Sequence, residues 1–158
     1  MISLRQIIID TNLLVLLIVG LTDRSLINKH KRTRTFEPED FDLLIKILAS
    51  YEKMLVTPHI LTEASNLVSQ IGEPVKKTVL LTLSNLISDH QEVFEPSSEI
   101  VKHEQFLRLG ITDCAILRLI KKDIPFVTVD WDLFQIASKD NKMATNFNYL
   151  RVPRMFKA

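Results

Sequence analysis

Cysteine and glycine are scarce in this sequence, and each shortage argues against certain classes of protein. The single cysteine, Cys114, cannot form a disulfide within the chain, which indicates a reducing compartment. Only 3 glycines occur among the 158 residues, and there are no low-complexity or repeated segments, so the composition argues against a disordered or repetitive chain. The hydrophobic fraction of 46% is enough for the core of one domain spanning residues 1–158.

An excess of charge of either sign is also missing. The 20 Lys and Arg residues nearly balance the 19 Asp and Glu residues, so the composition alone does not indicate nucleic-acid binding, which would need a local patch. The densest basic segment is residues 28–37, with Lys29, Lys31, Arg32 and Arg34. These side chains could bind phosphates of a nucleic acid without reading its sequence. A solvated surface loop without a ligand explains them equally well.

No hydrophobic segment is long enough to suggest a membrane span. Residues 13–21 form a continuous apolar run, far short of the ~20 residues that a spanning helix needs. A signal peptide starting at Arg5 is the alternative, but Asp10 and Asn12 precede the run and no small-x-small cleavage site follows it. The sequence therefore predicts a cytoplasmic protein without membrane contact.

Short apolar segments that fit strands alternate with segments of helical periodicity. The expected strands are residues 6–9, 54–57, 93–94, 126–129 and 146–150, the last at a sheet edge. The expected helices cover residues 12–20, 38–48, 60–71, 74–87, 98–109, 112–120 and 133–137. This alternation predicts an α/β fold with a central, mostly parallel sheet flanked by helices.

Acidic residues directly follow two of the expected strands. Asp10 follows residues 6–9, and Asp130 follows residues 126–129. Because open parallel sheets bind ligands beyond the C-terminal ends of their strands, both carboxylates are expected at the same edge of the sheet.

Two further acids are expected inside helices. Glu63 lies between Ile60 and Leu67 at helical spacing, so we expect it to face the core, where an unpaired carboxylate is costly. Asp113 is expected at the first helical position after a Thr112 cap, at the head of an apolar face. The simpler explanation for Asp113 is that an acid in the first turn suits the helix dipole.

A cluster of these acids would need a counter-charge. Two carboxylates 4 Å apart repel by ~4 kcal/mol at an effective dielectric of ~20, so some would be protonated or a cation would lie among them. Oxygen ligands select hard ions such as Mg²⁺ or Mn²⁺. Zinc is not indicated, because the other potential ligands lack its ligand spacing; these are His30, His59, His90, His103 and Cys114.

The order of the four acids resembles the PIN-domain family of metal-dependent nucleases. The segments IIIDTNLL (7–14) and TPHILTEASNL (57–67) resemble the family's opening strand and third-helix segment. LGITDCAIL (109–117) is similar to its leucine-glycine-x-threonine-aspartate pattern, and FVTVDWDLF (126–134) to its threonine-x-aspartate strand end. The resemblance extends over residues 6–150 and implies a single PIN-like domain, a three-layer sandwich.

The resemblance implies that the chain is a divalent-metal-dependent endoribonuclease. Asp10, Glu63, Asp113 and Asp130 would hold one or two Mg²⁺ or Mn²⁺ ions, and hydrolysis of RNA would leave a 5′ phosphate and a 3′ hydroxyl. Many family members are toxins of toxin–antitoxin pairs, so an antitoxin protein is an expected partner. The apolar first helix also fits a homodimer interface, although core packing explains it as well.

Polar and aromatic neighbours of the acids are expected to support the site. We expect four of these neighbours to orient ligands or waters, namely Thr11, Asn12, Thr112 and Thr128. Helix capping is the alternative for Asn12 and Thr112.

Three residues after Asp130 leave alternatives open. Asp132 could replace or assist Asp130, which the threonine-x-aspartate pattern favours. Trp131 could stack on a base or belong to the core, whereas core packing is favoured for Phe134.

Three other functions compete with this interpretation. Haloacid-dehalogenase-type phosphatases carry Asp-x-Asp after the first strand, but here the triplet is Asp10-Thr11-Asn12 and the second acid is missing. Structure-specific DNA nucleases are longer and carry extra DNA-binding elements. A PIN-like module that binds RNA or protein without cutting is the main alternative, and the presence of all four acids favours catalysis over it.

Overall fold

A computed structural model, which describes residues 5–121 and 123–151, contains a five-stranded parallel sheet. Its strands are β1 (Gln6–Ile9), β2 (Lys53–Val56), β3 (Gln91–Glu92), β4 (Phe126–Thr128) and β5 (Ala144–Asn146). Their order is β3-β2-β1-β4-β5, and every neighbouring pair is parallel. The predicted α/β class with a parallel sheet is therefore confirmed.

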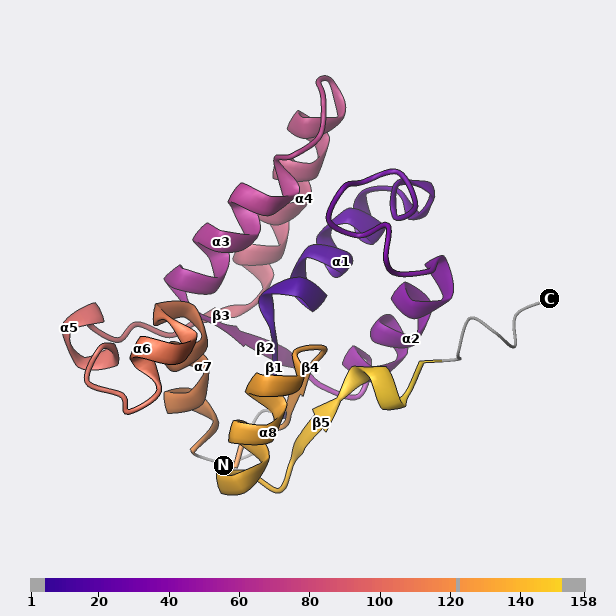
Figure 1. Cartoon of the computed structure of the whole chain (residues 1–158). Coiled ribbons are helices and arrows are strands. Elements are labelled where there is room, and N and C mark those ends of the chain that lie inside the picture. The colour runs from indigo at the N-terminus through magenta and orange to yellow at the C-terminus, as the bar shows by residue number, and fades with distance from the viewer. Residues whose placement is uncertain (1–4, 122, 152–158) are drawn as a thin grey trace.

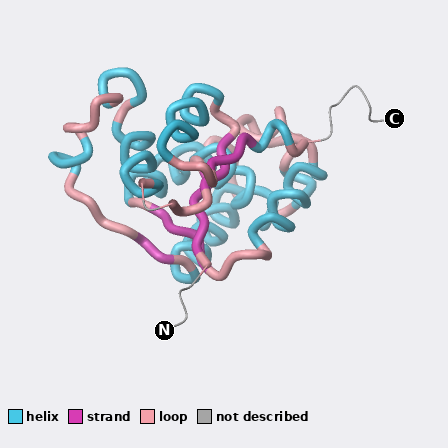
Figure 2. The backbone as a smooth tube through the Cα atoms, turned by 90° about the horizontal axis from the view of Figure 1, so that it is seen from below, coloured by secondary structure: helices cyan, strands magenta, loops and turns pink. Residues whose placement is uncertain are grey.

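Helices cover both faces of the sheet (Figures 1 and 2). On one side lie α1 (Thr11–Thr22), α2 (Pro38–Leu48), α3 (Pro58–Val68) and α4 (Val75–Asp89). The other side carries α5 (Ser97–Ile100), α6 (Phe106–Leu109), α7 (Ile111–Ile120) and α8 (Trp131–Asp140). The chain moves from β1 to β3 in one direction along the sheet and from β3 through β4 to β5 in the other. Right-handed crossovers then place the two sets of helices on opposite faces.

The first helix is buried on nearly all sides, as its continuous apolar run predicts. From Leu13 to Gly20 every residue is buried, and α1 packs against α2, α3 and α4. Gly20 allows α2 to approach closely, because a Cβ at this position would lie 2.2 Å from the Phe41 ring. Of the described helices, none combines the length and the hydrophobicity required to cross a membrane.

Two strands differ from the predicted segments. The third strand is residues 91–92 instead of 93–94, and Phe94 is 76% exposed. The last strand is residues 144–146, and residues 147–149 of the predicted strand form the 3-10 helix η2 (Phe147–Tyr149). Asn146 causes the change, because its side-chain oxygen accepts a hydrogen bond from the backbone N–H of Asn148 at 2.9 Å and caps η2.

The helix predicted for residues 98–109 is two short helices, α5 and α6, with turns between them. Gly110 follows with φ +84°, a conformation that other residues rarely adopt. It ends α6 and is also the N-cap of α7. Thr112 is therefore not the cap of α7, and Asp113 is the third residue of this helix instead of the first. The helix predicted to end at Gly72 stops earlier, at Val68.

The basic segment 28–37 is a series of turns anchored to the core, after a 3-10 helix, η1 (Arg24–Leu26). His30 and Thr33 are fully buried. His30 Nε2 donates to the carbonyl oxygen of Val68 at 2.9 Å, while its Nδ1 accepts from the backbone N–H of Arg32 at 3.0 Å. The backbone of the loop is therefore held in place by His30 and Thr33, while its four basic side chains, Lys29, Lys31, Arg32 and Arg34, are exposed to solvent.

Candidate functional site

Asp10 and Asp130 lie at the point where the strand order of the sheet reverses. Asp10 follows β1 and Asp130 follows β4, and these strands are neighbours, with Ile9 paired to Val127. The helices that follow them, α1 and α8, cover opposite faces of the sheet (Figure 1). Such reversal points form the crevice in which open α/β sheets bind ligands. The sequence-based expectation that the two carboxylates share one edge is confirmed.

Asp10 is a buried carboxylate with three protein donors. Its Oδ1 accepts from the backbone N–H of Leu13 at 2.8 Å and caps α1. Its Oδ2 accepts from Thr128 Oγ1 at 2.5 Å and from the backbone N–H of Val129 at 2.7 Å. Burial raises the pKa of Asp10, and these hydrogen bonds oppose the rise. Asp10 thus joins the end of β1 to the end of β4 and has a structural role of its own.

Thr128 connects the two acids that follow the strands. Its hydroxyl donates to Asp10 and accepts from the backbone N–H of Asp130 at 3.0 Å. Asp130 itself is exposed, and its Oδ1 caps α8 by accepting from the N–H of Leu133 at 2.9 Å. The position of Thr128 suits the orienting role expected from the sequence.

Asp113 lies near all three other acids. It is half-buried in the first turn of α7, and its pKa is raised to about 7, first by burial and then by the charges of Asp130, Glu63 and Asp10. Side chains from four separate segments of the chain therefore share one electrostatic environment, with Asp113 among them.

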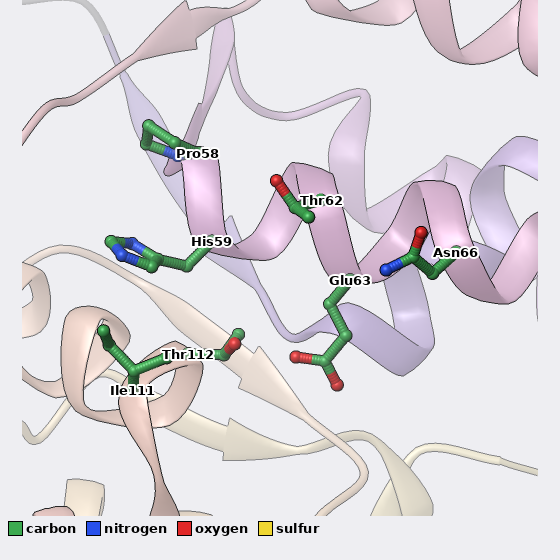
Figure 3. A pocket seen from close by; sticks show the side chains of 7 residues that line it. All are labelled: Pro58, His59, Thr62, Glu63, Asn66, Ile111 and Thr112. Atoms are coloured by element: carbon green, nitrogen blue, oxygen red, sulfur yellow. The ribbon is translucent and has the colours of Figure 1, made fainter. Parts of the chain in front are cut away.

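Glu63 is exposed, so the expectation that it faces the core is wrong. The buried face of α3 consists of Ile60, Leu61, Ala64 and Val68, which leaves Glu63 on the flank of the helix. Its carboxylate extends from α3 toward Thr112 at the start of α7 (Figure 3). Exposure removes the burial cost that the sequence suggested, but the proximity to Asp113 remains.

A pocket of about 460 Å³ borders Glu63 between α3 and the start of α7 (Figure 3). Its lining consists of Pro58, His59, Thr62, Glu63, Asn66, Ile111 and Thr112. His59 Nε2 contacts Ser97 Oγ at 3.0 Å, and its buried Nδ1 has no hydrogen-bond partner in the described part of the chain. Sequence reasoning missed this pocket, although polar residues repeating every four positions along α3 were a signal for a second, non-core face.

None of the four acids has a lysine or arginine partner among the described residues. The ion pairs there are Arg24–Asp42, Lys102–Glu99, Arg108–Asp132, Arg118–Glu95 and Arg151–Asp40. Asp132 is thus paired with Arg108, at 3.5 Å. Arg108, which sequence reasoning did not single out, brings a guanidinium from α6 to the start of α8.

The donor set suits a hard cation, but the side chains are not gathered as a finished coordination sphere. Within residues 5–121 and 123–151, no three His, Cys, Asp or Glu side chains are grouped so that they could hold a metal ion. Asp10 and Asp130 use oxygens as helix caps, whereas Glu63 and Asp113 make no hydrogen bond or ion pair with described residues. Binding would therefore require the free carboxylates to move toward the capping ones.

The remaining expected site residues lie at different distances from the acids. Thr11 is buried beside Asp10, and its hydroxyl has no partner in the described structure. Asn12 is exposed and does not cap α1, because Asp10 does. The basic residues Lys29, Lys31, Arg32 and Arg34 follow the far end of α1. That helix has 12 residues and is therefore about 18 Å long at 1.5 Å per residue.

Comparison with family models, curated proteins and solved structures finds no match. The PIN-domain resemblance therefore stays a prediction from the sequence motifs. The chemistry of the site is argued from the geometry of its own residues.

Proposed function

We propose that this chain is a divalent-cation-dependent endoribonuclease of the PIN type. The observation that carries the proposal is that the charges of Asp130, Glu63 and Asp10 all act on the half-buried Asp113. None of these four acids has a lysine or arginine partner among the described residues. Groups with strongly perturbed pKa values in a crevice are candidates for function. Hard cations such as Mg²⁺ or Mn²⁺ match an all-oxygen ligand set.

Some of these residues hold the site in place, and others are available to bind the cation. Asp10 and Thr128 fix the ends of β1 and β4, while the free carboxylates of Glu63 and Asp113 are available as ligands. A bound divalent cation would supply a water of lowered pKa and stabilise the leaving oxygen of a phosphodiester. Asp113, with a pKa near neutrality, would release its proton when the cation binds.

The substrate has room beside the acids. The pocket between α3 and α7 measures about 460 Å³, within the range of ~300–1,000 Å³ usual for small-molecule sites. Glu63 and Thr112 line it, so a nucleotide bound there would lie beside the Glu63 carboxylate. The guanidinium of Arg108, which reaches from α6 to Asp132 at the start of α8, could contact a neighbouring phosphate.

Cleavage assays with matched variants test this proposal. With Mn²⁺ and a pool of structured RNAs, Asp113→Asn and Glu63→Gln are each expected to cut at least about 100-fold more slowly than wild type, because altering even the residues that support metal ligands costs 10–100-fold. Asp140→Asn, the same change at an exposed acid near the other end of α8, should cut normally. Equal cleavage by all four proteins would contradict the proposal.

A PIN-like module that binds RNA or protein without cutting it is the second candidate. The observation that favours it is that no three of the described acids are grouped closely enough to hold an ion. RNA binding that Mn²⁺ does not convert into cleavage would support this candidate. A toxin role and an antitoxin partner are supported by the sequence resemblance alone.

A further inference from the structure

Three aromatic side chains form a cluster directly beside the acidic site. Trp131 and Phe134 lie on α8, and Tyr149 lies on η2. Their ring centroids are 5.9 Å (Trp131–Phe134), 6.3 Å (Trp131–Tyr149) and 6.0 Å (Phe134–Tyr149) apart. Unlike core aromatics, Trp131 is 51% exposed and Tyr149 is 66% exposed. Two large rings are therefore held together with much of their surface open to solvent.

The cluster is built on fixed elements of the fold. Trp131 is the first residue of α8, whose cap is Asp130. η2 is attached to the end of β4, because Asn148 Nδ2 donates to the carbonyl oxygen of Val129 at 3.0 Å. Phe147, in the same 3-10 helix, is fully buried. The rings are thus positioned before any ligand arrives, which lowers the entropic cost of binding to them.

Two features link the cluster to the acidic site: its position in the sequence and the charged side chains next to it. Trp131 directly follows Asp130, one of the four acids. Asp132, whose negative charge would repel a phosphate, is paired with Arg108. This guanidinium and the exposed rings together resemble the combination of cations and aromatic surfaces that holds single-stranded nucleic acid.

We propose that Trp131 and Tyr149 form a stacking platform for an unpaired base of an RNA strand, next to the bond that is cut. The inference rests on the proposed nuclease function and specifies its substrate as single-stranded at the cleavage site. Bases within a duplex are already stacked on each other and cannot lie on a protein ring, whereas splayed-out bases can. Stacking tolerates any base, so the platform adds affinity without strong sequence preference.

Fluorescence tests the platform directly, since Trp131 is the only tryptophan of the chain. Wild type without divalent cation, so that nothing is cut, is titrated with a short single-stranded RNA of mixed sequence and with the corresponding duplex. The single strand should quench Trp131 emission in a saturable way, and the duplex should bind more weakly with little quenching.

Variants distinguish base stacking on the rings from non-specific attraction between the protein and RNA. Their affinity is measured by the anisotropy of labelled RNA. Tyr149→Ala should bind the single strand about tenfold more weakly. Tyr149→Phe and Trp131→Phe keep an aromatic ring and should bind almost as wild type. Phe94→Ala removes a ring that is even more exposed, at 76%, beyond β3 at the opposite edge of the sheet, and should not change the affinity.

Each outcome bears on one of the two proposals. Quenching with the expected loss in Tyr149→Ala, together with cleavage by wild type, supports the platform. The same binding without cleavage keeps the stacking of a base on the rings and overturns the nuclease proposal on which the platform rests. Cleavage by wild type without quenching, or with unchanged affinity in Tyr149→Ala, overturns the platform and leaves the nuclease proposal standing. In that case the exposed rings would instead suit a protein interface.

Discussion

Replacing Asp10 by alanine is expected to destabilise the protein by about 3 kcal/mol, even without any metal. The change removes the acceptor of three donors at the ends of β1 and β4, namely the N–H groups of Leu13 and Val129 and the hydroxyl of Thr128. Loss of a helix cap costs about 1 kcal/mol, and each unsatisfied buried donor costs about 1–3 kcal/mol. Relief of the burial that raises the pKa of Asp10 offsets part of this cost.

Urea denaturation in the presence of a chelator measures this effect. Asp23→Ala is the matched control, because Asp23 caps the 3-10 helix η1 in the same way but is exposed. It should cost far less than Asp10→Ala. An Asp10→Ala protein as stable as wild type would show that the carboxylate does not join the strands. Because of this structural role, loss of cleavage in an Asp10 variant does not identify a metal ligand, and Asp113 and Glu63 are better positions for that test.

Asp113→Asn is expected to have the opposite effect and to stabilise the cation-free protein at pH 8. The pKa of Asp113 is raised from 3.8 to about 7 in the folded chain, so the folded state holds a proton that the unfolded state has released. The free energy of unfolding of wild type therefore falls as pH rises across this window, and ionised Asp113 costs stability above it. Asparagine carries no charge and avoids this loss.

The expected gain is on the order of 2 kcal/mol at pH 8, since one pKa unit corresponds to about 1.4 kcal/mol and partial exposure screens the charge. Comparison of urea denaturation at pH 5 and pH 8 should show the gain at pH 8 and much less of it at pH 5. His90, whose pKa is lowered mainly by burial, affects stability at low pH equally in both proteins and cancels in the difference. Asp113→Asn being less stable than wild type at both pH values would contradict the electrostatic coupling of the acids.

Local sequence patterns predicted the parts of the site that depend on a single element. A short apolar run ended by an acid was enough to place Asp10 and Asp130 at strand ends. Such patterns could not predict that β1 and β4 are neighbours in the sheet, because strand pairing depends on the path of the whole chain. The shared hydrogen bonds of Asp10 and Thr128 follow only from that pairing.

Other differences arise where one residue outweighs the periodicity around it. The buried face of α3 includes Leu61 and Ala64, so Glu63 lies on the flank of the helix and not on its core side. Gly110, with its positive φ, took the capping role that the sequence assigned to Thr112. Asn146 caps η2 and ends the last strand before Phe147. In each case a tertiary contact or a cap decided the structure, and helical or strand spacing could not reveal it.

The most direct test of the acidic site is a titration of the apparent stability with Mn²⁺ at pH 8. A ligand that binds only the folded state stabilises it by about 2.7 kcal/mol at a concentration 100 times its Kd. Wild type and Asp140→Asn should both gain stability in a saturable way, and Asp113→Asn, which starts out more stable, should gain little. An equal gain in all three proteins, or none in any, would contradict the claim that these carboxylates meet in order to hold a cation.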